Sequence, residues 1–85
     1  MVLNKYPKID VHGETTETVV FVVHDFIKDN YKMKNKYIVV IHGKGSGALK
    51  RKVHEILNQD KLVANFELDV MNIGQTLIEL KKNNE

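Results

Sequence analysis

The fold is decided by one stretch of the chain, Tyr37-Ile38-Val39-Val40-Ile41-His42-Gly43-Lys44-Gly45-Ser46-Gly47. Its first five residues form a continuous apolar run of strand length, which is typical of a central strand covered on both faces. A glycine-rich loop follows, and an apolar stripe at helical spacing then predicts a helix from about residues 46–48 to 58–61. Because ligands of open α/β sheets gather at the C-terminal ends of strands, this loop is the first candidate for a binding site.

Two elements are expected before this strand. In residues 8–12, two apolar side chains alternate with Asp10 and His12, which predicts a strand with one polar face. Apolar residues at helical spacing then predict a helix from Thr15 to Tyr31, with Thr15 as its N-cap. The β-branched run at 19–23 favours a strand instead, but the length of the segment and its lack of Gly and Pro favour the helix.

The rest of the chain predicts two more strands, near residues 62–70 and 76–80, joined through Gly74. The element order is then β-α-β-α-β-β, and we expect an α/β (α+β) two-layer sandwich with a mixed sheet. The first two strands, linked by a helix, should be parallel, and the last pair antiparallel. His12 and His42 would then lie at the same edge of the sheet.

Length and composition indicate one domain. Of the 85 residues, 42% are hydrophobic, and we place the domain at residues 9–80, between an N-terminal arm at 1–8 and a frayed tail at 81–85. Cysteine is absent, which excludes disulfides and thiolate metal sites. No apolar run approaches the about 18 residues that span a bilayer, and no hydrophobic segment follows the basic N-terminus. We therefore expect a cytoplasmic protein, monomeric in the simplest case, without a membrane partner.

The net charge of +2 says little about partners, but the basic residues cluster. One cluster comprises Lys32, Lys34 and Lys36, and the other comprises Lys44 and residues 50–52. Two local patches of this kind can meet a polyanion such as nucleic acid. Alternatively, they are solvated side chains in a loop and on a helix surface.

The glycine-rich loop combines three features of an anion site. Its glycines let the backbone approach a ligand closely, the helix start offers free amides to an anion, and Lys44 adds a mobile positive charge. The spacing is neither that of a Walker phosphate loop nor that of a dinucleotide-binding fingerprint. On its residues alone, the loop could also be a tight turn without a ligand.

Basic residues at the start of the following helix strengthen the anion-site interpretation. Lys50, Arg51 and Lys52 lie close to the positive end of the helix dipole, where they cost from a few tenths to ~1 kcal/mol. A bound phosphate would turn that cost into a gain, although Arg51 could also pair with Glu55 one turn later. The candidate phosphate-binding residues are therefore His42, Gly43, Lys44, Gly45, Ser46, Gly47, Lys50 and Arg51.

Asp10 and His12 form the second candidate site. A strand places both side chains on one face, and an apolar core does not accept them unless their polar groups are satisfied. Histidine titrates near neutrality and suits general acid–base catalysis, while Asp10 could orient it or help hold a divalent cation. His24 and His54 fall within the two predicted helices, and we interpret both as surface or structural residues.

These motifs resemble those of the Smr (small MutS-related) family. Ile9-Asp10-Val11-His12-Gly13 resembles the Leu-Asp-Leu-His-Gly motif that opens Smr domains, and Ile41-His42-Gly43-Lys44-Gly45 resembles their second motif. Gly74-Gln75-Thr76 is similar to the end of their glycine-rich third motif, although Met71 and Asn72 stand where the family often has two further glycines. The resemblance covers nearly the whole chain, with the motifs in the order of the family.

The resemblance implies a fold like that of the C-terminal domain of bacterial translation initiation factor three, and a function in binding DNA or RNA. Several members of the family are endonucleases, and the positions implicated in them map to Asp10, His12 and Lys44. We therefore expect an endonuclease in which His12 is the general acid or base and Lys44 and the loop hold the scissile phosphate. In this scheme His42 contacts substrate or transfers a second proton.

A divalent cation, Mg²⁺ or Mn²⁺, could bind at Asp10 and His12, but phosphodiester hydrolysis does not require one. Two other functions fit the same residues. The first is a non-catalytic DNA- or RNA-binding module that uses the loop and the lysines for backbone contacts. The second is an enzyme that acts on a small phosphate compound.

Overall fold

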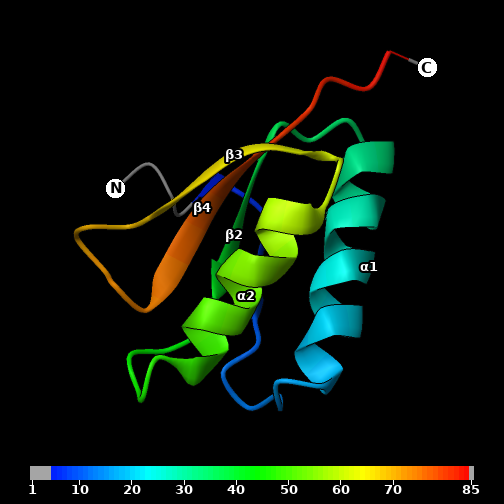
Figure 1. The fold of residues 1–85 in the computed structure, drawn as a ribbon. Helices are drawn as coiled ribbons and strands as arrows, with labels where there is room; N and C mark the ends of the chain where they lie inside the picture. The colour runs from blue at the N-terminus through cyan, green and yellow to red at the C-terminus, as the bar shows by residue number, and fades with distance from the viewer. Residues whose placement is uncertain (1–4, 85) are drawn as a thin grey trace.

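The computed structural model describes residues 5–84 and arranges them in the predicted order β-α-β-α-β-β. The elements are β1 (Lys8–Asp10), α1 (Thr18–Lys32), β2 (Tyr37–Ile41), α2 (Ala48–Gln59), β3 (Val63–Leu68) and β4 (Gln75–Leu80) (Figure 1). Residues 1–4 of the predicted arm and Glu85 of the predicted tail lie outside the described residues.

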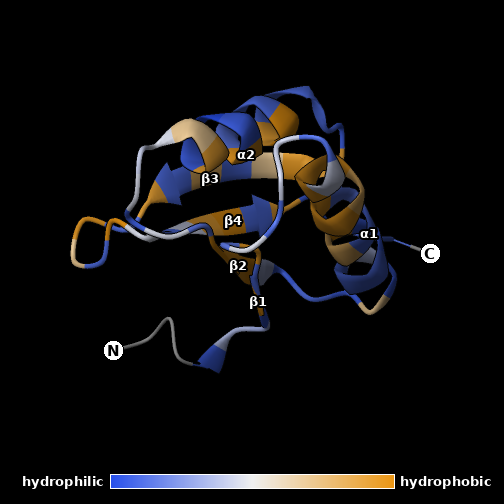
Figure 2. Ribbon diagram, turned by 90° about the horizontal axis from the view of Figure 1, so that it is seen from below, coloured by the Kyte–Doolittle hydropathy of each residue, from blue (hydrophilic) through white to orange (hydrophobic). Residues whose placement is uncertain are grey.

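The four strands form one mixed sheet in the order β1-β2-β4-β3. β1 is parallel to β2, with Asp10 opposite Ile41, and β4 runs antiparallel to both β2 and β3. Both helices cover one face of this sheet, so the domain has two layers (Figure 1, Figure 2). The predicted two-layer architecture, the parallel first pair and the antiparallel last pair are confirmed.

The core lies between the helices and the sheet. The side chains that fill it are almost completely buried, and they are Val11, Val19, Val23, Ile27, Ile38, Val40, Val53, Leu57, Ile78 and Leu80. Strand periodicity directs Ile38 and Val40 toward the helices and Val39 toward the opposite face. Val39 is also fully buried. The apolar run in β2 therefore reflects burial on both faces, as predicted, even though both helices lie on one of them.

The two predicted N-terminal elements are shorter in the structure. β1 ends at Asp10, because the Asp10 carboxylate accepts a hydrogen bond of 3.1 Å from the backbone N–H of His12 and turns the chain. α1 begins at Thr18, and the prediction of Thr15 as its N-cap is wrong. Instead, the Thr15 and Thr18 hydroxyls each accept a hydrogen bond of 3.0 Å from the other residue's N–H, which closes a turn ahead of the helix. From Thr18 on, the β-branched run is helical as predicted, since burial in the core outweighs the lower helix propensity of valine.

The C-terminal segment is held against the domain, where a frayed tail was expected. The Lys81 N–H donates a hydrogen bond of 2.8 Å to the Leu62 carbonyl. The Asn83 side-chain amide donates one of 2.9 Å to the carbonyl of Tyr31 near the end of α1. Over residues 5–84, none of the helices combines the length and the apolar character needed to cross a membrane.

Candidate functional site

Asp10 and His12 lie side by side where β1 ends. The His12 Nδ1–H donates a hydrogen bond of 2.6 Å to Asp10 Oδ1, and the backbone N–H of His12 donates to the same oxygen. These hydrogen bonds lower the pKa of the Asp10 carboxyl, so at neutral pH the group is a charged carboxylate that accepts. His12 therefore keeps a proton on Nδ1, which leaves Nε2 as the nitrogen that can take or give a proton.

The parallel pairing of β1 with β2 brings this pair to the glycine-rich loop. Asp10 is opposite Ile41, and the N–H of Val11 donates a hydrogen bond of 2.8 Å to the Ile41 carbonyl. His12 and the loop therefore follow at the same edge of the sheet. A Cβ placed on Gly43 would lie 3.4 Å from the Cβ of His12. The predicted convergence of the two motifs is confirmed.

The loop between β2 and α2 depends on glycine at two positions. Gly43 and Gly47 both have φ of +88°, a left-handed conformation that residues with a Cβ rarely adopt. Gly47 is the N-cap of α2, and having no side chain it cannot cap the N–H groups of the first turn. The Ser46 hydroxyl accepts a long hydrogen bond of 3.4 Å from the N–H of Ala48. The first turn of α2 therefore presents N–H groups that lack acceptors within the helix, an arrangement that favours an anion.

A cavity of about 480 Å³ lies beside the loop. It is lined by His12, Glu14, Thr15, Thr16, His42, Gly43, Lys44, Gly45, Ser46, Gly47, Ala48, Leu49 and Lys50. Apart from Arg51, every predicted phosphate-binding residue is among them, together with the candidate base His12. The lining residues that the sequence did not assign to the site are Glu14, Thr15 and Thr16, from the turn before α1, and Ala48 and Leu49, from the first turn of α2. The threonine two residues after Gly13 was seen, but it was interpreted as a helix cap.

Arg51 lies just outside this lining and still points to the loop. A Cβ on Gly47 would lie 3.2 Å from Arg51 Nη1, which places the guanidinium against the start of α2. The alternative pairing of Arg51 with Glu55 is not what the structure has, since the Glu55 carboxylate pairs with Lys52 at 2.9 Å. Arg51 thus adds positive charge beside the amides of the first turn.

Beneath the loop, hydrogen bonds link His42, Thr76 and His54. His42 Nδ1 lies 3.1 Å from the carbonyl oxygen of Gly43, which can only accept, so Nδ1 carries a proton. In the neutral ring Nε2 is then an acceptor, and it takes a hydrogen bond of 2.8 Å from the Thr76 hydroxyl. His54 Nε2 lies 2.8 Å from the same hydroxyl and donates to it. We call this arrangement, in the order His54, Thr76, His42, the histidine relay.

Burial favours the neutral form of both histidines in the relay. His42 is 4% exposed and Thr76 is fully buried, while His54 packs against Phe66 with ring centroids 5.0 Å apart. Desolvation lowers the pKa of both histidines, and the positive charge of Lys50 acts in the same direction. Protonating either ring would therefore place a poorly solvated charge between α2 and the sheet.

The relay changes the interpretation of His42, whereas His54 and His24 are the structural and surface residues that were predicted. Both ring nitrogens of His42 are occupied by Gly43 and Thr76, so its ring supports the loop, and the predicted contact with substrate is not what this geometry favours. His54 is a structural residue of the site. His24 lies on the surface, with Nδ1 3.7 Å from the Asp60 carboxylate.

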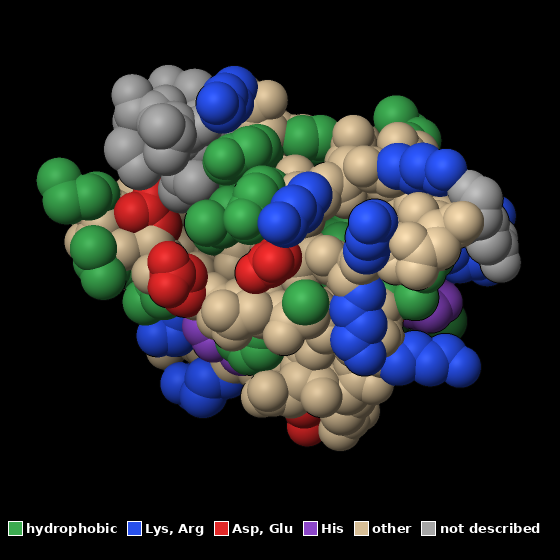
Figure 3. All heavy atoms as spheres, turned by 90° about the horizontal axis from the view of Figure 1, so that it is seen from above, with side chains coloured by type: hydrophobic (Ala, Val, Ile, Leu, Met, Phe, Trp, Pro, Cys, Tyr) green, Lys and Arg blue, Asp and Glu red, His purple; other side chains and the backbone are tan. Residues whose placement is uncertain are grey.

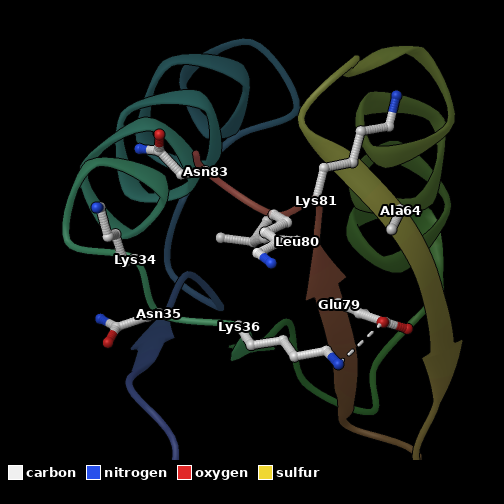
Figure 4. A pocket seen from close by; sticks show the side chains of 9 residues that line it. Lys34, Asn35, Lys36, Ala64, Glu79, Leu80, Lys81 and Asn83 are labelled. Carbon is white, nitrogen blue, oxygen red and sulfur yellow. Dashed lines mark ion pairs between the residues drawn. The ribbon is translucent and has the colours of Figure 1, made fainter. Parts of the chain in front are cut away.

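A larger hollow, of about 580 Å³, lies at the opposite end of the sheet (Figure 4). It is lined by Lys34, Asn35, Lys36, Ala64, Glu79, Leu80, Lys81, Lys82 and Asn83. Figure 3 shows that end from above, with Lys and Arg side chains beside Asp and Glu side chains, and Lys36 Nζ lies 3.9 Å from the Glu79 carboxylate. Because this hollow lies where β2 begins and the glycine-rich loop follows where β2 ends, the two predicted basic clusters occupy opposite ends of the domain.

Asp10 and His12 were possible ligands for a divalent cation, and here they bond to each other. Within residues 5–84, no group of three or more His, Cys, Asp or Glu side chains is arranged to hold a metal ion. Mg²⁺ needs several oxygen ligands in octahedral geometry, and this pair offers one carboxylate that is already hydrogen-bonded. The binding of a divalent cation at Asp10 and His12 therefore stays the open alternative that the sequence suggested.

Comparison with known proteins places these motifs in a family. The Smr domain model matches residues 9–81. The chain is 34% identical over 77 residues to Endonuclease MutS2 of Geobacillus sp. (strain WCH70), and also 34% identical over 77 residues to Endonuclease MutS2 of Finegoldia magna. Each match covers 87% of this chain and 10% of the relative, so the chain spans about a tenth of the length of these relatives.

Solved structures show the same fold. The Smr domain of Thermus thermophilus MutS2 matches with a TM-score of 0.85 at 26% identity, over 88% of this chain and 98% of that domain. YdaL, a stand-alone small MutS-related protein from Escherichia coli, shares the fold with a TM-score of 0.81 at 20% identity, over 92% of this chain and 69% of YdaL. The resemblance seen in the motifs is confirmed, and this chain belongs to the Smr domain family.

Proposed function

We propose that this Smr domain binds a nucleic-acid strand by its phosphates at the glycine-rich loop and cleaves a phosphodiester bond there. The observation that carries the proposal is that the Asp10–His12 pair and the loop meet at one edge of the sheet, around one cavity. The MutS2 relatives that contain a matching segment are named endonucleases, which supports a nuclease activity.

Binding would rest on charge and on backbone amides. Lys44 and Lys50 line the cavity, Arg51 lies against the start of α2, and the first turn of that helix presents N–H groups. All of these groups favour a phosphate and carry no information about base sequence. The loop therefore suits the backbone of a nucleic acid, and its contacts are equally available to DNA and RNA.

The chemistry would use His12 as the general base. Its Nε2 takes the proton of the attacking hydroxyl, which belongs to water or to the 2′-position of RNA, and that oxygen forms a bond to phosphorus as the bond to the leaving oxygen breaks. The leaving oxygen takes a proton from solvent. Asp10 holds the ring in the required tautomer and stabilises the imidazolium that forms, while Lys44 and the loop amides stabilise the charge that develops on the phosphate oxygens.

One observation favours a binding module without catalysis as the second candidate. The side chains of His12 and Asp10 are 69% and 51% exposed, so solvent screens the interaction between them. The module would use the same loop, and it would differ from the nuclease in forming no product.

The test is incubation of the purified protein with labelled single-stranded, duplex and branched RNA and DNA, with and without EDTA. We expect cleavage of at least one substrate by the wild type and by His24→Ala, and none by His12→Ala, with unchanged circular dichroism in all three. His24 is a matched control, because it is an exposed histidine on α1. Binding without any product would establish the module instead. Displacement by a mononucleotide as readily as by an oligonucleotide would favour a small phosphate compound as substrate.

A further inference from the structure

The connection between β3 and β4 exposes apolar side chains. Residues 70–73, which we call the β3–β4 tip, include Val70 at 85%, Met71 at 82% and Ile73 at 54% exposure. Within residues 5–84, five large hydrophobic side chains are exposed to this extent, and three of them lie in this tip. Figure 2 shows the tip projecting from the sheet with mostly hydrophobic residues. Grouped exposure of this kind marks an interaction site more often than scattered exposure does.

The tip is held in shape by hydrogen bonds among polar groups. The Asp69 carboxylate accepts hydrogen bonds of 2.9 Å from the Met71 N–H and from the Gln75 side-chain amide. The Asn72 side-chain oxygen accepts one of 3.1 Å from the Gly74 N–H, and the Asn72 backbone pairs with Asp69 and Gln75. The exposed apolar groups are therefore presented by a turn that these hydrogen bonds shape.

The same turn is bonded directly to the glycine-rich loop. The carbonyl of Gly74 accepts hydrogen bonds of 2.9 Å from the N–H groups of both His42 and Gly43. A Cβ on Gly74 would lie 3.2 Å from the Cγ of Lys44 and 3.2 Å from the Asn72 side-chain oxygen, so the two segments pack closely at this glycine. The tip therefore keeps a fixed position beside the proposed phosphate site.

We propose that the β3–β4 tip contacts the faces of unpaired bases in the strand whose phosphates lie at the glycine-rich loop. The inference rests on the proposed nucleic-acid-binding function and gives it a substrate class, namely single-stranded or locally unpaired nucleic acid. When a phosphate is bound at the loop, the base of the same or the next nucleotide is an apolar surface close to the tip. Aliphatic side chains and methionine pack favourably against base faces and act as wedges between bases in other nucleic-acid complexes. In a continuous duplex those faces are stacked on one another, and a side chain reaches them only by unstacking a step at a cost of a few kcal/mol. The tip therefore contacts bases more readily where the strand is already open.

The experiment compares two oligonucleotides that have the same phosphates. A labelled single strand of about 12 nucleotides, within the usual range of single-strand site sizes, carries bases, and its counterpart carries stable abasic sites at the internal positions. Both are made as DNA and as RNA. Affinities are measured for the wild type, the triple variant Val70→Ser/Met71→Ser/Ile73→Ser and Lys44→Ala. The matched control is Met33→Ser, which removes an apolar side chain that is 68% exposed and lies outside the tip.

We expect the wild type and Met33→Ser to bind the strand with bases about tenfold more tightly than the abasic strand, in line with the stacking energy of one base. The triple variant should lose that preference while keeping its affinity for the abasic strand and its melting temperature. Lys44→Ala should weaken both affinities and keep the preference.

The contrary outcomes separate the two proposals. If the wild type binds both strands equally, the tip does not contact bases, and phosphate binding at the loop stands. If the wild type binds neither strand as DNA or as RNA, the proposed function fails and the inference fails with it. If the triple variant keeps the preference for the strand with bases, the base-contact proposal is overturned. If it also sediments with a lower mass than the wild type, the tip is a self-association surface.

Discussion

Replacing Thr76 with Val removes one hydroxyl from the centre of the histidine relay and keeps the shape of the side chain. That hydroxyl donates to His42 Nε2 and accepts from His54 Nε2–H, each at 2.8 Å, in a residue that is fully buried. Each hydrogen bond contributes on the order of 1 kcal/mol, and a buried nitrogen left without its partner adds a further cost. We therefore expect Thr76→Val to lower the free energy of unfolding by about 2 kcal/mol, which for a chain of this length lowers Tm by roughly 8–16 °C.

The assay is thermal and urea unfolding followed by circular dichroism near pH 8, where both histidines are neutral. The matched control is Thr76→Ser, which keeps the hydroxyl and loses a buried methyl group worth about 0.8 kcal/mol. The valine variant should therefore be the less stable of the two. Nitrogen NMR of the wild type should also find the proton of His42 on Nδ1 and that of His54 on Nε2, because the Gly43 carbonyl fixes the direction of the relay. A valine variant as stable as the wild type would refute the relay as a source of stability.

Three further predictions concern the phosphate site and the relay. Lys44→Ala should keep the stability of the wild type within about 0.5 kcal/mol, because the side chain is exposed. It should lose much of the cleavage activity, whereas Lys44→Arg should keep much of it. Full activity in the alanine variant would show that the loop is only a turn. Affinity for an oligonucleotide should fall steeply with salt, with a slope of about 0.7–0.9 per phosphate neutralised, and a salt-independent affinity would contradict binding through phosphates. Burial lowers the pKa of His42 and His54, so below about pH 6.5 the unfolded chain binds more protons than the folded chain. The free energy of unfolding should therefore be full above about pH 6.5 and fall below it, by at most about 1.4 kcal/mol per pH unit for each ring. Urea unfolding between about pH 5 and 8 tests this, and a flat profile would contradict it.

Sequence patterns located the site because its parts are local in the chain. The apolar run at 37–41 and the glycines after it fix where a strand ends and a helix begins. The βαβ rule then makes the first two strands parallel, and parallel strands bring residues that follow them to one edge. These steps place His12 beside the glycine-rich loop without any knowledge of side-chain contacts.

The histidine relay escaped sequence reasoning because its members are far apart in the chain and meet only through the register of the sheet. His42 and Thr76 are 34 residues apart, and His54 and Thr76 are 22 apart. One signal was available, since Thr76 alternates with Ile78 and Leu80 and must face the core. A polar side chain at such a position needs partners, and the same reasoning applied to His54 on the inner face of α2 would have suggested one.

The turn before α1 and the β3–β4 tip were missed for a different reason. In both segments the backbone is shaped by side chains that bond to nearby amides, as with Thr15 and Thr18 and with Asp69 and Asn72. Such local bonds compete with helix and strand patterns and are not visible in hydrophobic periodicity. Only the folded chain brings the turn before α1 to the cavity beside the loop, and Gly74, next to the tip, into hydrogen bonds with that loop.

The position of His12 relative to the loop depends on the shortest element of the fold. β1 has three residues at the edge of the sheet, and so short a strand would be weak on backbone pairing alone. Its anchor is the next residue, Val11, which is fully buried in the core and whose N–H bonds to the Ile41 carbonyl. The loop on the other side is fixed by the Gly74 carbonyl and the histidine relay. The candidate base is thus held by a buried residue next to it, and the start of the loop that leads to the proposed phosphate-binding amides is held by Gly74 and the buried ring of His42. This support positions His12 beside the loop while the side chains of His12 and Lys44 stay open to a substrate.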